Sequence, residues 1–387
     1  MTDRRNTPHI VVSGRLPPPT DGMSRVTALV LDRLRSRGPL GAPQGASVEV
    51  ADLSPGWNGG GLRYHAAKAM RVLLAGLRLA AGATIPGRRF YMPVDSGLGI
   101  FYTAALAGTA RLFGYERTLH HHSFATISKP TWRMSLLTRI AGTDCMHVLL
   151  CPAMQARFQA LYPAARTAMN VSNAIFTPPV PRPRHGKSGP LRIGHLSNLC
   201  ADKGLDTLFT LLRALKAEEV DVRLVLAGPG LGRMDNALVA AGLVAFDGDV
   251  EYRGPVDGDA KAAFYRDIDV FVFPTRYRNE AQPLVLFEAM AAGVPVLAYE
   301  RGCIGSDIPA EGLVPQDADF IKSALPILAA WADDREALAA ASAQTLTRAR
   351  VAYETSRTGL DLLLDRIAGP HPATAAAAVT TTMTTCR

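Results

Sequence analysis

The 387-residue chain is long enough for two domains of about 150–200 residues, and its composition, 48% hydrophobic and 20% charged, is typical of a soluble globular protein. No stretch of 18 apolar residues is free of charge, which excludes an ordinary transmembrane helix, and the five cysteines show no CxxC pair or zinc-binding spacing. The net charge of +8 is uneven: residues 1–180 hold 20 Lys and Arg against 8 Asp and Glu, a balance of +12, whereas the remainder holds 22 against 26, a balance of −4.

Short apolar runs alternate with helical periodicity through the first half of the chain. The run His9–Ser13 predicts a strand, and apolar residues from Met23 to Leu34 predict a helix after a turn-rich loop. The alternation continues, with strands expected at 47–53, 89–94, 117–122 and 147–151 and helices at 63–81 and 98–113. Strands that alternate with helices indicate a parallel sheet covered by helices on both faces.

A proline-rich segment, residues 178–190 (PPVPRPRHGKSGP), separates two such series and is expected to be a semi-rigid linker. After it, strands are expected at 191–196, 222–227, 250–253, 270–273 and 294–298, with a helix at 205–215. An alanine-rich helical stretch is expected to open just after Pro326 and to run to about Ile367.

These elements predict two doubly wound α/β domains. We expect an N-terminal Rossmann-like domain over 1–180, a linker over 181–190, a C-terminal Rossmann-like domain over 191–368 and a disordered tail over 369–387. Whether the last helix returns to the N-terminal domain is left open. Ligands of open α/β sheets bind at the carboxyl ends of the strands, and domain interfaces favour pockets, so a small-molecule or nucleotide ligand between the domains is expected.

Two glutamates follow the strand expected at 270–273. An irregular loop after Pro274 carries Glu280, and a helix that begins near Pro283 carries Glu288 and ends at Gly293. Carboxylates at the carboxyl edge of a sheet accept hydrogen bonds from vicinal hydroxyls, as acidic residues do when they bind ribose. The alternative is a pair of solvated glutamates on an ordinary helix.

This segment resembles the motif of a known enzyme family. Glu280, seven further residues, Glu288 and the run AMAAGVPVLA are similar to the retaining glycosyltransferases of family 4, which have the GT-B fold of two Rossmann-like domains. The resemblance covers the whole second half of the chain and, more loosely, the first half. It implies that Glu280 contacts the donor sugar and that Glu288 contacts the nucleotide ribose.

A second segment, GHLSNLCADKG at 194–204, lies between an expected strand and an amphipathic helix. Lysine and glycine at a helix start favour phosphate binding. The family pattern falls on Ser197, Asn198 and Lys203, and Asn198 stands where the family usually has arginine. We therefore expect Arg276 or Arg301 to supply the missing cation; the alternative for Lys203 is a solvated lysine at a helix start.

The segment EYRGPV at 251–256 resembles the strand edge whose backbone meets the nucleotide base, which implies contacts at Gly254 and Val256. Recognition by main chain leaves UDP, GDP and ADP undistinguished. A plain strand that ends in a turn is the alternative.

In the first half, TLHHHSF at 118–124 ends an expected strand. Relatives often place there a histidine that contacts the donor sugar, which implies His122 first and His121 second, with a merely structural role as the alternative. Three consecutive histidines on a strand cannot all face one ion, so no metal site is expected. Gly22 stands in the loop that approaches donor phosphate and acceptor in relatives.

The resemblance implies a retaining, metal-independent hexosyltransferase whose donor is a nucleotide-diphosphate sugar, with no other cofactor. Its acceptor is expected to be a glycan or a lipid-linked glycan, in bacterial cell-surface, lipopolysaccharide or exopolysaccharide synthesis. The alternatives are a nucleotide-sugar epimerase of similar fold and a nucleotide-sugar-binding protein without transfer activity. No nucleic-acid module is present, so nucleic acid is not an expected partner.

The N-terminus (MTDRRNTPHIVVSG) lacks an apolar signal core, so a cytoplasmic location is expected. The basic amphipathic stretches at 64–81 and 129–139 suit the anionic inner face of the plasma membrane, which would make the protein peripheral there. Ordinary packed helices with a solvated basic face are the alternative.

Overall fold

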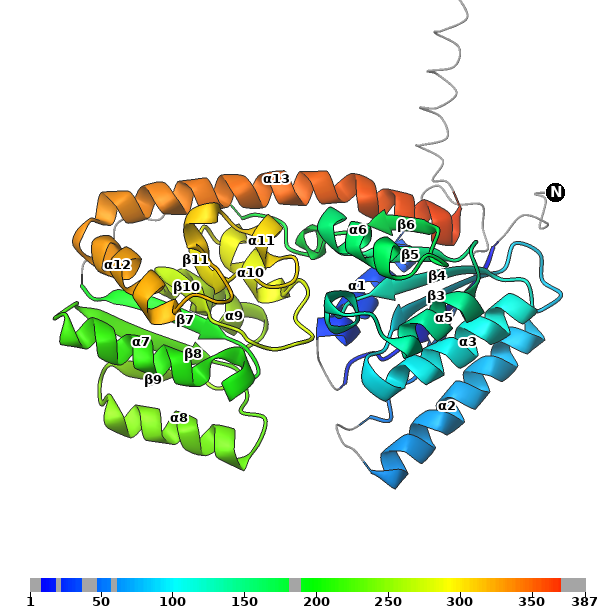
Figure 1. Cartoon of the computed structure of the whole chain (residues 1–387), viewed down its shortest axis with the longest axis horizontal. Coiled ribbons are helices and arrows are strands. Elements are labelled where there is room, and N and C mark those ends of the chain that lie inside the picture. Colours follow the sequence, from blue (N-terminus) through cyan, green and yellow to red (C-terminus); the bar gives the residue numbers. More distant parts are fainter. Residues whose placement is uncertain (1–7, 19–21, 37–46, 57–60, 181–188, 370–387) are drawn as a thin grey trace, which may run out of the picture. The chain divides into compact units, whose positions relative to one another are not determined.

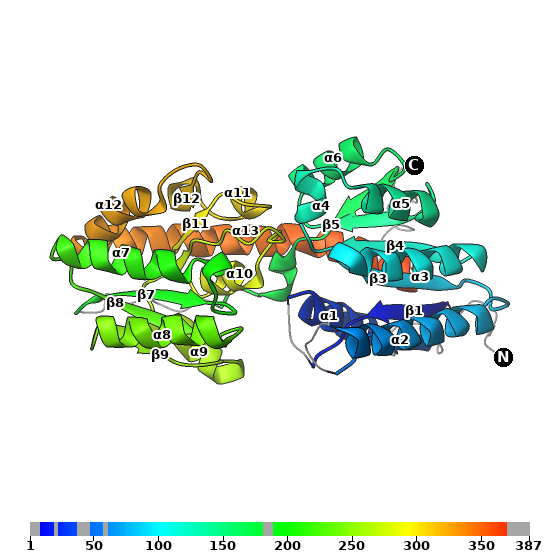
Figure 2. The ribbon, with the colours of Figure 1, turned by 60° about the horizontal axis from the view of Figure 1, so that its bottom comes forward.

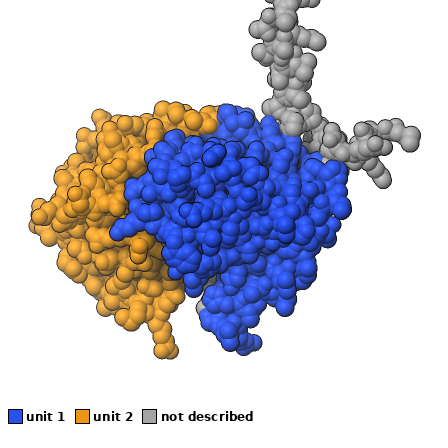
Figure 3. Space-filling view, turned by 45° about the vertical axis from the view of Figure 1, so that its right-hand side comes forward, with its two compact units in different colours: residues 1–172, 356–387 blue, residues 173–355 orange. Residues whose placement is uncertain are grey.

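The computed structural model describes residues 8–18, 22–36, 47–56, 61–180 and 189–369. The chain divides into two compact units: unit 1 comprises residues 1–172 and 356–387, and unit 2 comprises residues 173–355 (Figure 3). The division falls after Ser172 rather than after residue 180. Most of the predicted linker, at 181–188, and nearly all of the predicted tail, at 370–387, lie outside the described residues.

Unit 1 is built on a parallel six-stranded sheet with the strand order β2-β1-β3-β4-β5-β6. Its strands are β1 (His9–Gly14), β2 (Ser47–Asp52), β3 (Arg89–Val94), β4 (Glu116–His121), β5 (Met146–Leu149) and β6 (Thr167–Asn170). All six residues of β1 are buried. A strand buried on both faces is a continuous apolar run, as the sequence HIVVSG has.

The helices of unit 1 connect these strands. They are α1 (Gly22–Ser36), α2 (Leu62–Ala81), α3 (Ile100–Leu112), α4 (Ala125–Ser128), α5 (Trp132–Ala141) and α6 (Pro152–Leu161). The helix α5 begins after Thr131, whose hydroxyl accepts a hydrogen bond from the Met134 amide at 3.3 Å. The helices α2, α3 and α5 lie side by side (Figures 1 and 2).

Unit 2 contains a second parallel sheet, with the order β12-β11-β10-β7-β8-β9. Its strands are β7 (Leu191–Leu196), β8 (Val222–Ala227), β9 (Val250–Tyr252), β10 (Val270–Phe273), β11 (Val296–Tyr299) and β12 (Leu313–Val314). Alternate residues of β10 enter different cores: Val270 and Val272 belong to one apolar cluster, and Phe271 and Phe273 to the other. The sheet is therefore covered on both faces, as the period of two along a strand requires.

The helices of unit 2 divide between these two cores. One core takes residues from α7 (Leu205–Ala217), α8 (Arg233–Ala245) and α12 (Phe320–Asp333), and the other takes residues from α9 (Gly258–Asp267), α10 (Leu284–Ala291) and α11 (Ile304–Asp307). Two parallel sheets covered by helices confirm the predicted α/β class.

The C-terminal helical stretch differs from its prediction. Pro326 lies inside α12, which begins at Phe320 because the Asp319 carboxylate accepts hydrogen bonds from the Ile321 and Lys322 amides at 2.9 and 3.3 Å. The prediction that the helical stretch opens just after Pro326 is therefore wrong. The following helix, α13 (Arg335–Ala368), begins in unit 2, and its residues from Ser356 onward belong to unit 1.

Gly359 explains how α13 approaches unit 1 so closely. A Cβ at this position would lie 2.6 Å from the carbonyl oxygen of Asn170, at the end of β6. Only glycine permits this contact. Within the described ranges, no helix has the length and apolar character needed to cross a membrane.

Candidate functional site

The carboxyl ends of β7, β8 and β9 meet through backbone contacts. The Gly228 amide donates to the Gly254 carbonyl at 2.7 Å, and the Tyr252 hydroxyl donates to the Gly228 carbonyl at 3.0 Å. Gly228 has a φ of +110°, and a Cβ there would collide with the Ser197 carbonyl. These contacts bring the predicted residues Ser197 and Gly254 to one edge of the sheet.

The Lys203 loop is attached to the end of β10 at the same edge. Gly204 has a φ of +86°, and a Cβ there would lie 2.5 Å from the Pro274 carbonyl oxygen. The Arg276 amide donates to the Asp202 carbonyl at 2.8 Å. Glycine is required at residue 204 both by the left-handed backbone and by this close approach.

Lys203 and Glu280 form a direct ion pair. The Lys203 ammonium also lies 4.7 Å from the centre of the Tyr277 ring and 5.5 Å from that of Phe273. The two charged side chains are only 17% and 11% exposed. A cation held by a carboxylate and two aromatic faces keeps both charges in place at a site with little water.

Glu288 has a lysine partner of its own. The Lys261 ammonium, from α9, donates to the Glu288 carboxylate at 2.8 Å, and the Tyr265 hydroxyl lies 3.0 Å from its other oxygen. Both carboxylate oxygens are thus fixed in direction by α9. An ionised carboxylate with remaining lone pairs is the acceptor that vicinal hydroxyl groups require. Val256 packs against the apolar cluster that contains Tyr265.

His195 orients the hydroxyl of Ser197. Its Nδ1 lies 2.9 Å from the Val272 carbonyl, which can only accept, so Nδ1 carries the proton. Complete burial lowers the pKa of His195 to about 4, and the ring is therefore neutral near pH 7. Its Nε2 accepts from the Ser197 hydroxyl at 2.8 Å, and this leaves the lone pairs of the Ser197 oxygen available to a ligand.

The two arginines expected to compensate for Asn198 differ in their surroundings. Asn198 is exposed at the end of β7. Arg276 donates from Nη2 to the Tyr299 hydroxyl at 2.9 Å and stacks over that ring. Arg301 precedes Gly302, which packs against the Glu280 carbonyl, and its side chain has no ion pair or hydrogen bond with the described residues. Arg301 is therefore the freer of the two cations.

The histidines at the end of β4 point to opposite sides of the strand. His121 is 2% exposed, and its Nε2 lies 2.9 Å from Nδ1 of His147, beside the ring of Phe158. Burial, followed by the neighbouring histidines, lowers the pKa of His121 well below its ordinary value. His121 is therefore committed to the interior of unit 1, and the ligand contacts implied for His121 and His122 stay predictions.

His122 stacks on His120, with ring centres 4.1 Å apart, and is half-buried. His120 in turn lies with Nδ1 2.7 Å from the Tyr91 hydroxyl. His122 is thus partly exposed although its Nε2 is buried, whereas the whole His121 side chain lies in the interior.

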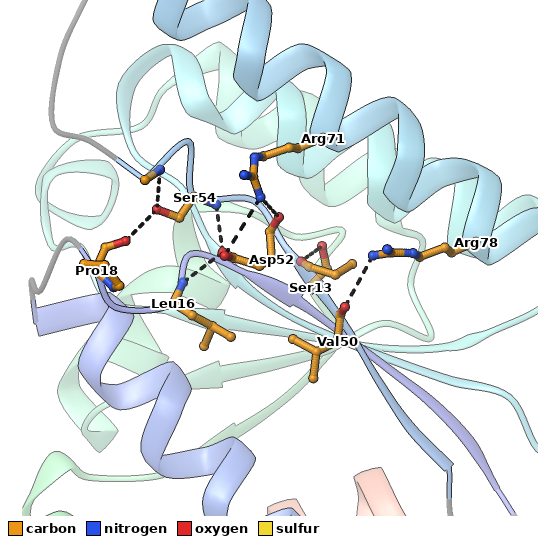
Figure 4. Close-up of polar contacts among 10 residues, drawn as sticks. Ser13, Leu16, Pro18, Val50, Asp52, Ser54, Arg71 and Arg78 are labelled. Atoms are coloured by element: carbon orange, nitrogen blue, oxygen red, sulfur yellow. Dashed lines mark hydrogen bonds and ion pairs between the residues drawn. The ribbon is translucent and has the colours of Figure 1, made fainter.

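Gly22 is the first residue of α1 and is exposed. The residues 16–18 before it are fixed by Asp52 at the end of β2 (Figure 4). The Asp52 carboxylate accepts from the Leu16 amide at 3.2 Å and from the Ser54 amide at 2.8 Å, and the Ser54 hydroxyl donates to the Pro18 carbonyl at 3.1 Å. This network holds residues 16–18 against the end of β2; residues 19–21 of the predicted loop lie outside the described residues.

The predicted residues therefore fall into two groups. In unit 2, contacts join the Ser197 region to Gly254 and Lys203 to Glu280, while Glu288 pairs with Lys261; in unit 1, His121 ends β4 and Gly22 begins α1. The list for unit 2 is Ser197, Asn198, Lys203, Gly254, Val256, Arg276, Glu280 and Glu288, and for unit 1 it is Gly22, His121 and His122.

Sequence reasoning missed Lys261 and Tyr265. In the sequence these two residues are separated by one helical turn, after Gly258. That spacing predicts only that they lie on the same face of a helix, not that they bind Glu288. The part of the chain that the structure describes contains no group of three or more His, Cys, Asp or Glu side chains that could hold a metal ion.

Residues 190–348 match the family model described as Glycosyl transferases group 1. The GDP-mannose-dependent alpha-(1-6)-phosphatidylinositol monomannoside mannosyltransferase of Mycobacterium tuberculosis is 31% identical over 217 residues, which are 51% of this chain and 56% of that protein. The lipopolysaccharide core biosynthesis mannosyltransferase LpsB of Rhizobium meliloti is 42% identical over 89 residues, 22% of this chain and 24% of that protein. The matches span about half or less of these relatives.

Solved structures resemble the whole chain at low identity. Anabaena HepE in complex with UDP has a TM-score of 0.64 at 15% identity, over 96% of this chain and 100% of that one. WaaG, a glycosyltransferase involved in lipopolysaccharide biosynthesis, has a TM-score of 0.62 at 15% identity, over 93% and 100%. At these identities the likeness concerns the fold.

Proposed function

We propose that this chain, which has the GT-B fold and whose residues 190–348 belong to the glycosyl transferases group 1 family, moves a hexose from a nucleotide-diphosphate sugar to a glycan or lipid-linked acceptor. The observation that carries the proposal is the pair of Lys–Glu contacts in unit 2. Two carboxylates, each held by a lysine, suit a ligand with a polyol at either end of a diphosphate.

In the proposed reaction, Lys203 and the backbone around Gly204 stabilise the leaving diphosphate as its charge develops. Glu280 and His122 orient the sugar, and Glu288 accepts from the ribose hydroxyls. Arg301, or else Arg276, supplies the cation that Asn198 lacks. The configuration of the transferred sugar is expected to be retained, because the acceptor hydroxyl approaches from the face that the diphosphate leaves. The leaving phosphate can then take the proton of that hydroxyl.

The transfer is proposed to need no metal ion. Full activity in EDTA is the expected result, and its abolition by a chelator with restoration by Mg²⁺ or Mn²⁺ would overturn this part of the proposal.

The donor is tested first with GDP-mannose, because two of the curated relatives are named GDP-mannose-dependent. UDP-glucose is the second choice, since a structural neighbour was solved in complex with it. A thermal-shift comparison separates them, because a ligand at about 100 times its Kd stabilises the folded state by about 2.7 kcal/mol.

Glu280→Gln tests the central assignment. The variant keeps the size of the side chain but weakens its pairing with Lys203, so transfer should fall by about 100-fold while the nucleoside diphosphate still binds. Glu218→Gln, at the exposed end of α7, is the matched control and should leave transfer unchanged. Equal activity of Glu280→Gln and wild type would contradict the assignment.

The same assay separates the alternatives. If the donor is converted, without any acceptor, to a nucleotide sugar with one inverted stereocentre, the protein is an epimerase. Donor binding without turnover, with all candidate acceptors, would favour a binding protein that lacks transfer.

The acceptor side is proposed to rest on an anionic membrane, at the inner face of the plasma membrane during synthesis of a cell-surface polysaccharide. The outer surface of α2, α3 and α5, together with the turn Gly97–Gly99 just before α3, is here called the apolar helical face; it includes Leu62, Met70, Leu73, Leu77, Leu98 and Trp132, each at least 56% exposed. Met70, Leu73 and Leu77 recur at three- and four-residue intervals, so they share one side of α2. Phe101 and Trp132 link α3 to α5, with ring centres 5.7 Å apart.

Charge favours a lipid occupant over a second copy of the chain. The helices α2, α3 and α5 contain no Asp or Glu, and they carry the exposed Arg63, Arg78, Arg111 and Arg139. Two copies of such a face would repel, whereas anionic headgroups would attract it.

Vesicle sedimentation tests this partner. Leu73→Glu with Leu77→Glu should abolish binding to phosphatidylglycerol-containing vesicles. Met234→Glu with Val244→Glu, at two more exposed apolar residues of α8, should not. A wild-type chain that ignores the vesicles but forms dimers broken by the first variant would overturn the membrane proposal.

A further inference from the structure

The loop that carries Glu280 is joined to two distant segments through Gln282. Gln282 is 5% exposed and follows Glu280 by two residues. Its side-chain oxygen accepts from the Asn173 amide at 2.7 Å, and its carbonyl accepts from the Asn173 side-chain nitrogen at 2.7 Å. Its side-chain nitrogen donates to the Asp307 carboxylate at 2.9 Å. One residue thus links the loop to the start of unit 2 and to α11.

The residues on either side of Gln282 make further contacts to the same region. The Cys303 amide donates to the Ala281 carbonyl at 2.8 Å. A Cβ at Gly302 would lie 2.6 Å from the Ala281 carbonyl oxygen and 2.7 Å from that of Glu280. The backbone from Glu280 to Gln282 is therefore held by direct contacts, while the Glu280 carboxylate extends to Lys203.

We propose that Gln282 is a positioning residue, which fixes the Glu280 carboxylate by holding its loop between Asn173 and Asp307. The consequence for transfer rests on the proposed function of Glu280. The mechanical part, that Gln282 fixes the loop, stands on the hydrogen bonds alone.

The hydrogen bond between Gln282 and Asp307 can be tested by exchanging the amide and the carboxylate between the two residues. Asp307 is buried, and its Oδ2 has no hydrogen-bond partner among the described residues. The charged group that faces it is Arg348 of α13, whose Nε lies 3.4 Å from the Asp307 carbonyl. Burial raises the pKa of Asp307 to about 7, which means that its surroundings stabilise a negative charge poorly. A second carboxylate placed beside Asp307 would therefore be destabilised as well.

Gln282→Glu places two carboxyl groups against each other. At pH 6 they share a proton and the contact persists, but at pH 8.5 both ionise and repel. The double variant Gln282→Glu with Asp307→Asn exchanges amide and carboxylate, so that residue 307 donates and residue 282 accepts. It should restore the contact at both pH values.

The first measurement is hydrogen exchange of residues 276–283, corrected for the intrinsic pH dependence. We expect at least tenfold faster exchange for Gln282→Glu than for wild type at pH 8.5, near-equal exchange at pH 6, and recovery in the double variant. Gln316→Glu is the control, because Gln316 donates to a carbonyl, that of Glu300, at an exposed position. Equal exchange in wild type and Gln282→Glu at pH 8.5, or no recovery in the double variant, would overturn the proposal.

The second measurement is transfer kinetics with the same proteins. kcat should fall at least tenfold for Gln282→Glu at pH 8.5, with the Kd for the nucleoside diphosphate within threefold of wild type because Glu288 and Lys261 are unchanged. A wild type without any transfer would defeat the proposed function and leave the exchange result standing. Normal kcat in Gln282→Glu, when Glu280→Gln is inactive, would overturn the link between Gln282 and Glu280.

Discussion

The two units place their charges in opposite ways. In unit 2, the carboxylates of the candidate site each have a lysine: Lys203 holds Glu280, and Lys261 holds Glu288. In unit 1, the outer helices α2, α3 and α5 carry arginines and no carboxylate. Paired charges at a sheet edge can select a few atoms of a small ligand, whereas exposed arginines around apolar side chains suit an extended anionic surface. A net charge of +8 describes neither arrangement.

The largest expected effect distinguishes the two lysine pairs of unit 2. Lys203→Ala should lower kcat/KM by about 10²–10³-fold, because it removes a cation from the developing charge of the leaving group. Lys261→Ala should instead raise the KM for the donor by about tenfold and spare kcat, because it only loosens Glu288. Steady-state kinetics check both, with Lys216→Ala, at the surface pair with Asp249, as the control. Equal losses in kcat would mean that the two pairs act as one unit.

A second prediction concerns pH and Asp307. The folded state raises the pKa of this carboxyl to about 7, so between about pH 4 and pH 7 the unfolded chain releases a proton that the folded chain retains. This group therefore loses its stabilising contribution as the pH rises through that window. Asp307→Asn should be more stable than wild type by about 2–4 kcal/mol at pH 8, with the difference vanishing near pH 4. Denaturant unfolding across the pH range checks this, and parallel curves for both proteins would contradict it.

The glycines at the unit 2 edge give a third, smaller effect. Gly204→Ala adds a Cβ to a left-handed residue and presses it on the Pro274 carbonyl, so the free energy of unfolding should fall by about 2–3 kcal/mol. Gly248→Ala is the matched control, because Gly248 also has a positive φ but nothing within 4 Å of the added atom, and should cost about 1 kcal/mol. The difference between the two unfolding curves measures the close approach alone. Identical losses of unfolding free energy in the two variants would show that the Gly204 loop moves away from Pro274 without a measurable cost.

The smallest expected effect is on the apolar helical face of unit 1. Arg139→Gln, at an exposed residue of α5, should weaken binding to anionic vesicles by about fivefold, since each cation near such a surface contributes about 1 kcal/mol. Arg223→Gln, at an exposed residue of β8 in unit 2, should change nothing. Sedimentation at low and high salt checks both, because the effect of Arg139 should shrink as salt screens it. An equal loss for Arg223 would mean that only net charge matters.

Much of the fold and part of the site follow from local sequence alone. Apolar β-branched runs with sharp turn boundaries predict β3, β7, β8 and β10 with the bounds that the structure has. The resemblance carried by Glu280 and Glu288 is confirmed by the family match over residues 190–348. The positions of Lys203 and Glu280 also follow, because each lies in the segment that connects a strand of the parallel sheet to the next α-helix.

Only the tertiary structure decided which groups meet. Gln282 bonds to Asn173 across 109 residues, and Lys261 reaches Glu288 from a separate helix. The same holds for His121 and His147, and for the end of α13, which leaves unit 2 for unit 1. Periodicity and turn chemistry are properties of neighbouring residues, so a sequence states them directly. A contact between distant residues depends on how whole elements pack, and the residues that make it carry no local sign of one another.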